Sequence, residues 1–146
     1  MKAKKLTGEK AAEYIEDGMI IGLGTGSTAY YAIKKVGEMV RNGLQIKAVP
    51  TSKETAELAA AEGIELVELA DVESLDLTID GADEVDSDFN LIKGGGGALL
   101  REKIVASATD KLIIVVDESK LVEHLGDFPL PVEITPFSWQ YTKRMI

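Results

Sequence analysis

Cysteine is absent from this 146-residue sequence, and histidine occurs only once, at His124. Without cysteine the protein can form no disulfide, no cysteine-ligated zinc site and no thiol nucleophile. A single imidazole also excludes any metal site or catalytic triad that needs two histidines. The chemistry of this chain must therefore come from carboxylates, lysines, hydroxyls and backbone groups.

Basic residues are few: 16 Lys and Arg stand against 25 Asp and Glu, which gives a net charge of −9. This balance argues against a nucleic-acid-binding protein, which needs a basic face. An anionic small molecule remains a suitable ligand if its site is locally positive. The longest apolar runs, such as residues 112–116, fall far short of the ~18 residues that suggest a membrane span. The lysine-rich start is followed by polar residues 7–10, so we expect no targeting segment, no membrane partner and a cytoplasmic location.

The order of apolar and polar residues is typical of an α/β fold. The length predicts one domain, or one domain plus a fragment. The pattern predicts helices over residues 7–16, 29–40, 52–61 and 98–107, with Ser52 as a candidate N-cap of the third. It predicts strands over residues 19–23, 46–49, 64–69, 75–80 and 111–116, the first and last of them buried. This alternation indicates a Rossmann-like, largely parallel sheet flanked by helices.

Four informative segments are expected at the carboxyl ends of the strands: residues 24–28, 80–83, 93–97 and 117–120. In open parallel sheets, ligands bind at the carboxyl ends of the strands. We therefore expect these four segments to converge on one binding site.

The first of these segments is a glycine-rich loop, residues 24–28, between a predicted strand and a predicted helix. Glycines let a ligand approach the backbone, and a helix start presents unpaired N–H donors and a partial positive charge. The hydroxyls of Ser27 and Thr28 add further donors. The loop is predicted to bind phosphate or carboxylate, and a purely structural turn is the alternative.

A nucleotide fits this loop less well than a monophosphate. Gly24-x-Gly26-x-x-Ala29 matches a loose dinucleotide pattern, but the acid expected about 20 residues further on is missing. Residues 49–52, Val-Pro-Thr-Ser, occupy that place. An ATP P-loop is also disfavoured, because no Gly-Lys-Ser/Thr follows the glycines.

Four carboxylates lie within residues 80–86. A divalent-metal site is one hypothesis, and a solvated turn is another that suits Asp86 and Asp88. Asp80 and Asp83 differ, because they follow a buried strand on a small Gly-Ala turn. We predict catalytic or hydroxyl-binding roles for these two.

An EF-hand-like calcium loop starting at Asp86 fails on spacing. Leu91 stands where such a loop requires glycine. Gly97 stands where the closing glutamate should be. The acid cluster is therefore not predicted to bind calcium in this way.

The second glycine loop, residues 94–97, lies between Lys93 and a predicted helix. Its glycines are predicted to form an anion-binding nest of backbone N–H groups, with the lysine supplying positive charge. Glu102 lies early in the following helix, where its simplest role is a surface charge at the helix N-terminus. The helix dipole should lower the pKa of this carboxyl and weaken it as a base, whereas a closed site of low dielectric could raise it. The sequence leaves this open.

Taken together, these motifs resemble those of ribose-5-phosphate isomerases of the A type. The resemblance runs in order over nearly the whole chain, and the ordered set is specific although each motif alone is weak. It rests on Gly24–Thr28 (GTGST), Asp80–Asp83 (DGAD), Lys93–Gly96 (KGGG), Arg101–Lys103 (REK), Asp117–Lys120 (DESK) and Phe128–Glu133 (FPLPVE).

The resemblance implies an aldose–ketose isomerase of the pentose phosphate pathway that uses no metal and no organic cofactor. Glu102 would move a proton between C1 and C2 of the open-chain sugar, while Asp80 and Asp83 would act on sugar hydroxyls and ring opening. Lys93 would stabilise the enediolate oxygen with the glycine N–H groups. Lys4 is a looser match for a further positive charge. The implied substrate-binding residues are Thr25, Gly26, Ser27, Thr28, Gly81, Ala82, Gly94, Gly95, Gly96 and Lys120.

The resemblance also implies a domain arrangement. Residues 1–130 would form the catalytic domain, and residues 131–146 would begin a small α+β lid that is incomplete here. We expect a homo-oligomer, dimer or tetramer, and an apolar tail at Trp139, Tyr141 and Ile146 that needs a partner. The main site should form, with activity weak or lost. The competing hypothesis is a non-catalytic sugar-phosphate sensor, which would not need the acids and the lysine of the implied catalytic set.

Overall fold

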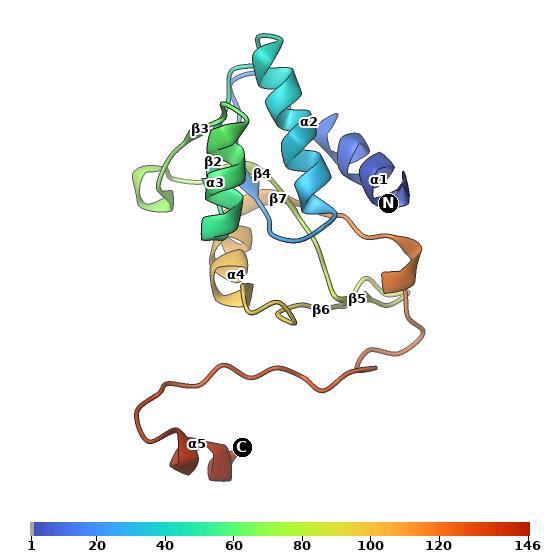
Figure 1. Cartoon of the computed structure of the whole chain (residues 1–146), viewed down its shortest axis with the longest axis vertical. Coiled ribbons are helices and arrows are strands. Elements are labelled where there is room, and N and C mark those ends of the chain that lie inside the picture. Colours follow the sequence, from blue (N-terminus) through green and yellow to red (C-terminus); the bar gives the residue numbers. More distant parts are fainter. Residues whose placement is uncertain (1) are drawn as a thin grey trace.

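A parallel sheet forms the centre of the protein in a computed structural model that describes residues 2–146 (Figure 1). Its five strands lie in the order β3–β2–β1–β4–β7, and every neighbouring pair is parallel. Parallel strands need crossover connections, and here helices supply most of them. The strands are β1 (Ile20–Leu23), β2 (Lys47–Pro50), β3 (Glu65–Leu66), β4 (Leu75–Asp80) and β7 (Thr109–Ile114).

Helices cover both faces of this sheet, as the sequence predicted. Three of them contribute to the larger apolar core over one face: α1 (Lys2–Ala12), α2 (Ala29–Arg41) and α3 (Lys53–Ala61). A fourth helix, α4 (Leu99–Ser107), places Val105 in a second core cluster. The remaining elements are α5 (Trp139–Met145) and two short 3₁₀ turns, η1 (Leu69–Asp71) and η2 (Glu118–Lys120). In residues 2–146, no helix is long and apolar enough to cross a membrane.

The first helix differs from its predicted range of 7–16. It runs from Lys2 to Ala12, and the next residues form a turn with hydrogen bonds between residues three apart, such as Ile15 N–H to the Ala12 carbonyl oxygen at 3.1 Å. A Cβ on Gly8 would lie 2.7 Å from the backbone nitrogen of Ala32, so α1 and α2 cross in close contact there. The helix α1 thus packs along α2, and it includes the lysine-rich residues 2–5. The local sequence pattern does not reveal this packing.

Two further predictions about strands were wrong in part. The strand expected over residues 64–69 is only Glu65–Leu66, because the chain turns into η1. The strand expected to be buried over residues 111–116 begins at Thr109 and lies at the sheet edge, where Leu112 is 42% exposed. An apolar run cannot distinguish a central strand from an edge strand, because that depends on which strands pair.

A small antiparallel ribbon was not predicted: β5 (Glu84–Val85) pairs with β6 (Leu91–Ile92). Its turn is stabilised by Asp86, whose carboxylate accepts hydrogen bonds from the backbone N–H groups of Asp88 and Asn90. The ribbon connects the end of β4 to the second glycine loop. It therefore sets the distance between the acidic motif of residues 80–83 and the glycine-rich motif of residues 93–97.

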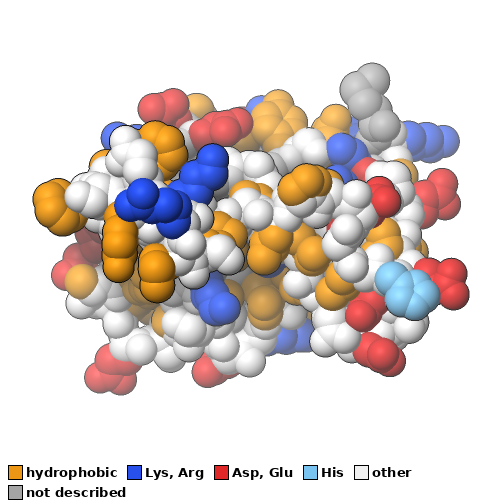
Figure 2. Space-filling model, turned by 90° about the horizontal axis from the view of Figure 1, so that it is seen from below, with side chains coloured by type: hydrophobic (Ala, Val, Ile, Leu, Met, Phe, Trp, Pro, Cys, Tyr) orange, Lys and Arg blue, Asp and Glu red, His pale blue; other side chains and the backbone are white. Residues whose placement is uncertain are grey.

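The chain after η2 returns along this ribbon and then runs away from the sheet. The buried carboxylate of Glu84 accepts hydrogen bonds from the backbone N–H groups of Gly126 at 2.7 Å and Asp127 at 3.1 Å. Beyond them the chain extends to α5, which lies apart from the other helices (Figure 1). Trp139, Tyr141 and Ile146 are exposed, as expected for an unpartnered tail. Figure 2 shows the molecule from the side on which α5 lies in Figure 1, and hydrophobic side chains are exposed there among charged ones.

Candidate active site

A cavity of about 180 Å³ opens at the carboxyl end of the sheet, and all four predicted segments contribute to it. Val115, Val116 and Ala98 complete its wall and were not predicted. The predicted residues that line it are Thr25, Gly26, Ser27, Thr28, Gly81, Ala82, Asp83, Lys93, Gly94, Gly96, Glu102 and Lys120. The expected convergence is thus confirmed, whereas Asp80 and Gly95 do not line this cavity.

The first glycine loop passes directly over the end of β4. A Cβ on Gly24 would lie 2.1 Å from Oδ1 and 2.5 Å from Cα of Asp80, so only glycine fits here. Gly26 has a φ of +115°, a conformation that other residues rarely adopt. The chain then enters α2, whose first N–H groups have no partner inside the helix. The loop thereby places the start of α2, the positive end of the helix dipole, beside the cavity that Gly26, Ser27 and Thr28 line, an arrangement suited to an anion.

Substituting Gly24→Ala should lower the free energy of unfolding by about 1–3 kcal/mol, because the new methyl group overlaps the Asp80 backbone and the loop must move. Gly96→Ala is the matched control, since a Cβ there meets no atom within 4 Å and should change stability by less than about 0.5 kcal/mol. Urea unfolding of both variants measures the difference. Equal stability of the two would contradict the close approach.

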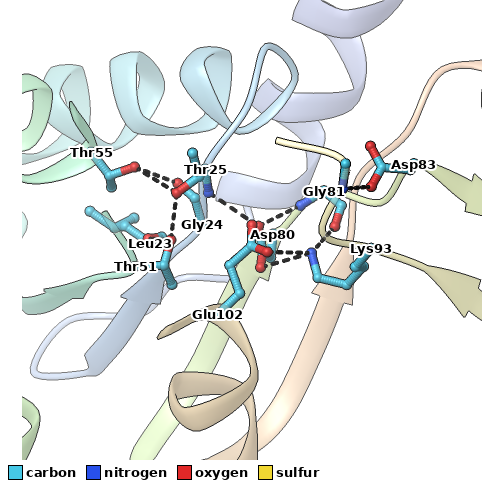
Figure 3. Close-up of polar contacts among 11 residues, drawn as sticks. Leu23, Gly24, Thr25, Thr51, Thr55, Asp80, Gly81, Asp83, Lys93 and Glu102 are labelled. Atoms are coloured by element: carbon cyan, nitrogen blue, oxygen red, sulfur yellow. Dashed lines mark hydrogen bonds and ion pairs between the residues drawn. The ribbon is translucent and has the colours of Figure 1, made fainter. Parts of the chain in front are cut away.

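Asp80 is buried beneath the cavity and links three segments of the site (Figure 3). Its Oδ1 accepts hydrogen bonds from the backbone N–H groups of Thr25 at 3.1 Å and Gly81 at 2.8 Å. Its Oδ2 lies 3.1 Å from Nζ of Lys93. The carboxylate therefore orders the first glycine loop, its own turn at Gly81 and the lysine, although it was predicted to face the substrate directly.

Lys93 and Glu102 face each other at the inner end of the cavity. Nζ of Lys93 lies 3.5 Å from Oε2 of Glu102 and also donates to the Gly81 carbonyl oxygen. The Glu102 side chain is only 7% exposed, although it belongs to the first turn of α4. Burial raises the pKa of Glu102 to about 7, and the negative charge of Asp80 adds to this effect while Lys93 opposes it. The sequence left the direction of this pKa change open, and in the structure burial raises it.

The second glycine loop holds Asp83 at the opposite wall. Gly94 has a φ of +99°, which lets the chain turn after Lys93. The backbone N–H of Gly95 donates to Oδ2 of Asp83 at 2.8 Å. Gly95 was predicted to contact substrate, but its N–H is bound to this carboxylate instead. The loop orients Asp83 while Gly94 and Gly96 line the cavity.

Two lysines, Lys4 and Lys120, bring positive charge to the region of the first glycine loop and the cavity. Lys4 of α1 donates to Oγ of Ser27 at 2.7 Å and lies 3.6 Å from Oδ2 of Asp117. Lys120, from the turn that Asp117 caps, lies in the cavity wall. The loose sequence match at Lys4 thus lies beside the predicted phosphate-binding loop.

Two residues that sequence reasoning missed support this loop from behind. Thr51 and Thr55 are buried at the end of β2 and the start of α3, and both hydroxyls lie within hydrogen-bonding distance of the Thr25 hydroxyl. They occupy the region where a dinucleotide-binding protein would carry its ribose-binding acid. The sequence shows that this acid is missing, whereas only the structure shows that threonine hydroxyls take its place.

The other acids of residues 80–86 have structural partners. Glu84 binds the backbone at residues 126 and 127, and Asp86 binds its own turn. Within residues 2–146, no group of three or more His, Asp or Glu side chains is arranged to hold a metal ion. The solvated-turn interpretation of Asp86 is confirmed, and Asp88 beside it is exposed.

Known proteins resemble this chain over its whole length. The family model described as "Ribose 5-phosphate isomerase A (phosphoriboisomerase A)" matches residues 47–146. A ribose-5-phosphate isomerase A of Bacillus mycoides is 61% identical over 146 residues, which cover 100% of this chain and 66% of the relative. One of Listeria monocytogenes is 62% identical over 143 residues, covering 98% of this chain and 64% of that protein.

Solved structures give the same result for the fold. A D-ribose-5-phosphate isomerase in complex with phospho-erythronic acid superposes with a TM-score of 0.94 at 43% identity, over 99% of this chain and 64% of that one. Ribose 5-phosphate isomerase A of Methanocaldococcus jannaschii gives 0.94 at 41% identity, over 99% and 65%. The chain thus spans about two thirds of the length of the proteins it matches.

Proposed function

This chain belongs to the ribose 5-phosphate isomerase A family, and on that premise we propose that it interconverts D-ribose 5-phosphate and D-ribulose 5-phosphate through an enediolate. The observation that carries the proposal is the buried Glu102 carboxyl, which faces Lys93 at 3.5 Å in a cavity lined by both glycine loops. Aldose–ketose exchange through an enediolate needs a base, which can be a carboxylate, and fixed positive or N–H donors at the developing oxyanion. Both requirements are met here without cysteine or a histidine pair.

Glu102 is the proposed base. Its pKa of about 7 places it near neutral pH, where a base both accepts a proton readily and returns it. In the open-chain aldose it would remove the proton from C2 and deliver it to C1, while the hydroxyl proton moves between the two oxygens. Lys93 would stabilise the negative oxygen of the enediolate, since its ammonium group already lies beside the carboxylate.

The remaining residues have proposed roles in binding and ring opening. Asp83 faces the cavity with one carboxylate oxygen held by Gly95, so the other can accept a proton from a sugar hydroxyl. The start of α2 and the nearby Lys4 and Lys120 would hold the phosphate. Phospho-erythronic acid, which the solved relative binds, carries the same two kinds of group as ribose 5-phosphate, namely a phosphate and a hydroxylated chain.

We also propose the wider setting of this activity. Residues 1–130 would form the catalytic domain, and residues 131–146 would begin an α+β lid. The exposed apolar side chains of Trp139, Tyr141 and Ile146 support an oligomer, dimer or tetramer, in which they are covered. The reaction would belong to the non-oxidative branch of the pentose phosphate pathway, in the cytoplasm.

Incubating the chain with ribose 5-phosphate in D₂O tests the proposed function. An enediolate mechanism predicts ribulose 5-phosphate with deuterium at C1, because the base exchanges its proton with solvent before returning it. NMR detects this product even when turnover is slow. Binding of ribose 5-phosphate without any deuterated product would favour a sensor and contradict the enzymatic proposal.

A further inference from the structure

Three threonine hydroxyls meet behind the first glycine loop (Figure 3). We call Thr25, Thr51 and Thr55 the threonine cluster. Oγ1 of Thr25 lies 2.8 Å from Oγ1 of Thr51 and 3.3 Å from Oγ1 of Thr55. Thr51 and Thr55 are 0% and 3% exposed, so water does not compete for their hydrogen bonds. Thr25 alone reaches the cavity.

The direction of each hydrogen bond in this cluster follows from counting protons. Thr51 donates to the Leu23 carbonyl oxygen at 3.0 Å, and Thr55 donates to the Gly24 carbonyl oxygen at 2.9 Å. A carbonyl oxygen can only accept, and a hydroxyl has one proton to give. Both buried hydroxyls have therefore given their protons away. With the two protons placed in this way, Thr25 is the donor in the 2.8 Å contact, in which either hydroxyl could otherwise donate.

The Thr25 hydroxyl consequently has lone pairs, but no proton, to offer to a ligand. Ser27 on the same loop is in the opposite state. Its Oγ accepts a hydrogen bond from Lys4, whose ammonium group can only donate, so the Ser27 proton remains available. Two hydroxyls that look equivalent in the sequence thus differ in what they can bind.

We propose that Thr51 and Thr55 are positioning residues that make Thr25 an acceptor for a sugar hydroxyl, whereas Ser27 is a donor to the phosphate. This inference rests on the proposed function and deepens it, because it separates recognition of the sugar from recognition of the anion. The cluster fixes the Thr25 side chain from one side. Asp80 fixes the Thr25 backbone N–H from the other, and Asp80 also holds Lys93.

Binding of two probes to single-site variants tests the assignment. Thr25→Val keeps the shape of the side chain and removes its hydroxyl, and Ser27→Ala is the matched variant on the same loop. The probes are ribose 5-phosphate and methyl phosphate at pH 8, because methyl phosphate carries the dianion without any hydroxyl. Isothermal titration calorimetry of this chain gives both dissociation constants.

Thr25→Val should weaken ribose 5-phosphate binding by about three- to tenfold, the effect of one hydrogen bond, and leave methyl phosphate binding within twofold. Ser27→Ala should weaken both probes. The conservative Thr25→Ser should restore ribose 5-phosphate binding. If Thr25→Val weakens methyl phosphate as much as Ser27→Ala does, Thr25 is a phosphate donor and the inference is wrong.

A second measurement decides the positioning role independently of any ligand. Thr51→Val should speed amide hydrogen exchange at Thr25 at least fivefold, and Thr51→Ser should return it to the wild-type rate. Unchanged exchange in Thr51→Val would overturn the role of Thr51. Failure of the wild-type chain to bind either probe would instead refute the proposed function, and the exchange result would still stand.

Discussion

Replacing Glu102 by Gln should lower kcat for ribose 5-phosphate isomerisation by about a thousandfold, within the range typical of a lost general base. Glutamine keeps the size of the side chain and can still accept a hydrogen bond from Lys93, so the Kd for ribose 5-phosphate should stay within about threefold. Steady-state rates and calorimetric binding measure the two quantities. Loss of turnover with retained binding is the result expected if Glu102 is the base.

The matched control is Glu73→Gln, which removes an exposed carboxylate in the loop before β4 and should leave both quantities unchanged. If Glu102→Gln retained more than a tenth of the wild-type turnover, another group would have to be the base. If it lost binding and turnover equally, Glu102 would be a binding residue.

The pH profile of the wild-type protein follows from the same carboxyl. Burial raises the pKa of Glu102 from 4.5 to about 7, so the group is protonated and inactive as a base below that pH. The value of kcat/KM should therefore rise as the pH increases through about 7, and fall tenfold per pH unit well below it.

The native state also binds this proton on Glu102 more tightly than the unfolded chain does. Glu102 therefore favours unfolding as the pH rises from 4.5 through 7, and Glu102→Gln should remove that loss.

Lys93→Met should lower kcat/KM by about a hundred- to a thousandfold, because the enediolate oxygen loses its fixed positive charge. The same substitution should move the rising limb of the pH profile to higher pH. Lys93 is the group that lowers the pKa of Glu102, against the effects of burial and of Asp80. Without the ammonium group the Glu102 carboxyl holds its proton more tightly. Rate measurements between pH 6 and pH 10 separate the two effects.

Asp80→Asn provides the contrasting variant. Because the Asp80 charge raises the pKa of Glu102, its removal should move the limb to lower pH, opposite to Lys93→Met. Lys120→Met, at the cavity wall, should weaken binding without moving the limb. A Lys93→Met profile whose limb stays near pH 7 would show that Lys93 does not act on Glu102 as the 3.5 Å contact indicates.

Local sequence determined the elements with strong internal signals. The helix at α2 and the Ser52 cap of α3 appear where the pattern placed them, because apolar spacing and capping act within a few residues. The predicted ends of α1 were wrong because they depend on packing against α2. The predicted burial of β7 was wrong because it depends on the pairing order of the strands. The β5–β6 ribbon has only two residues per strand, too short for any periodic signal.

For the site, the sequence by itself determined which chemical groups are present and which strand ends carry them, since parallel strands must bring their carboxyl ends to one edge. Only the tertiary structure decided what each group can do. Asp80 is buried and accepts a hydrogen bond from the Thr25 N–H, and the Gly95 N–H donates to Asp83. Burial raises the pKa of Glu102 to about 7, and Thr51 and Thr55 place two buried hydroxyls against the Thr25 hydroxyl. A pKa and a proton direction depend on the dielectric and partners around a group, and these come from residues far away in the chain.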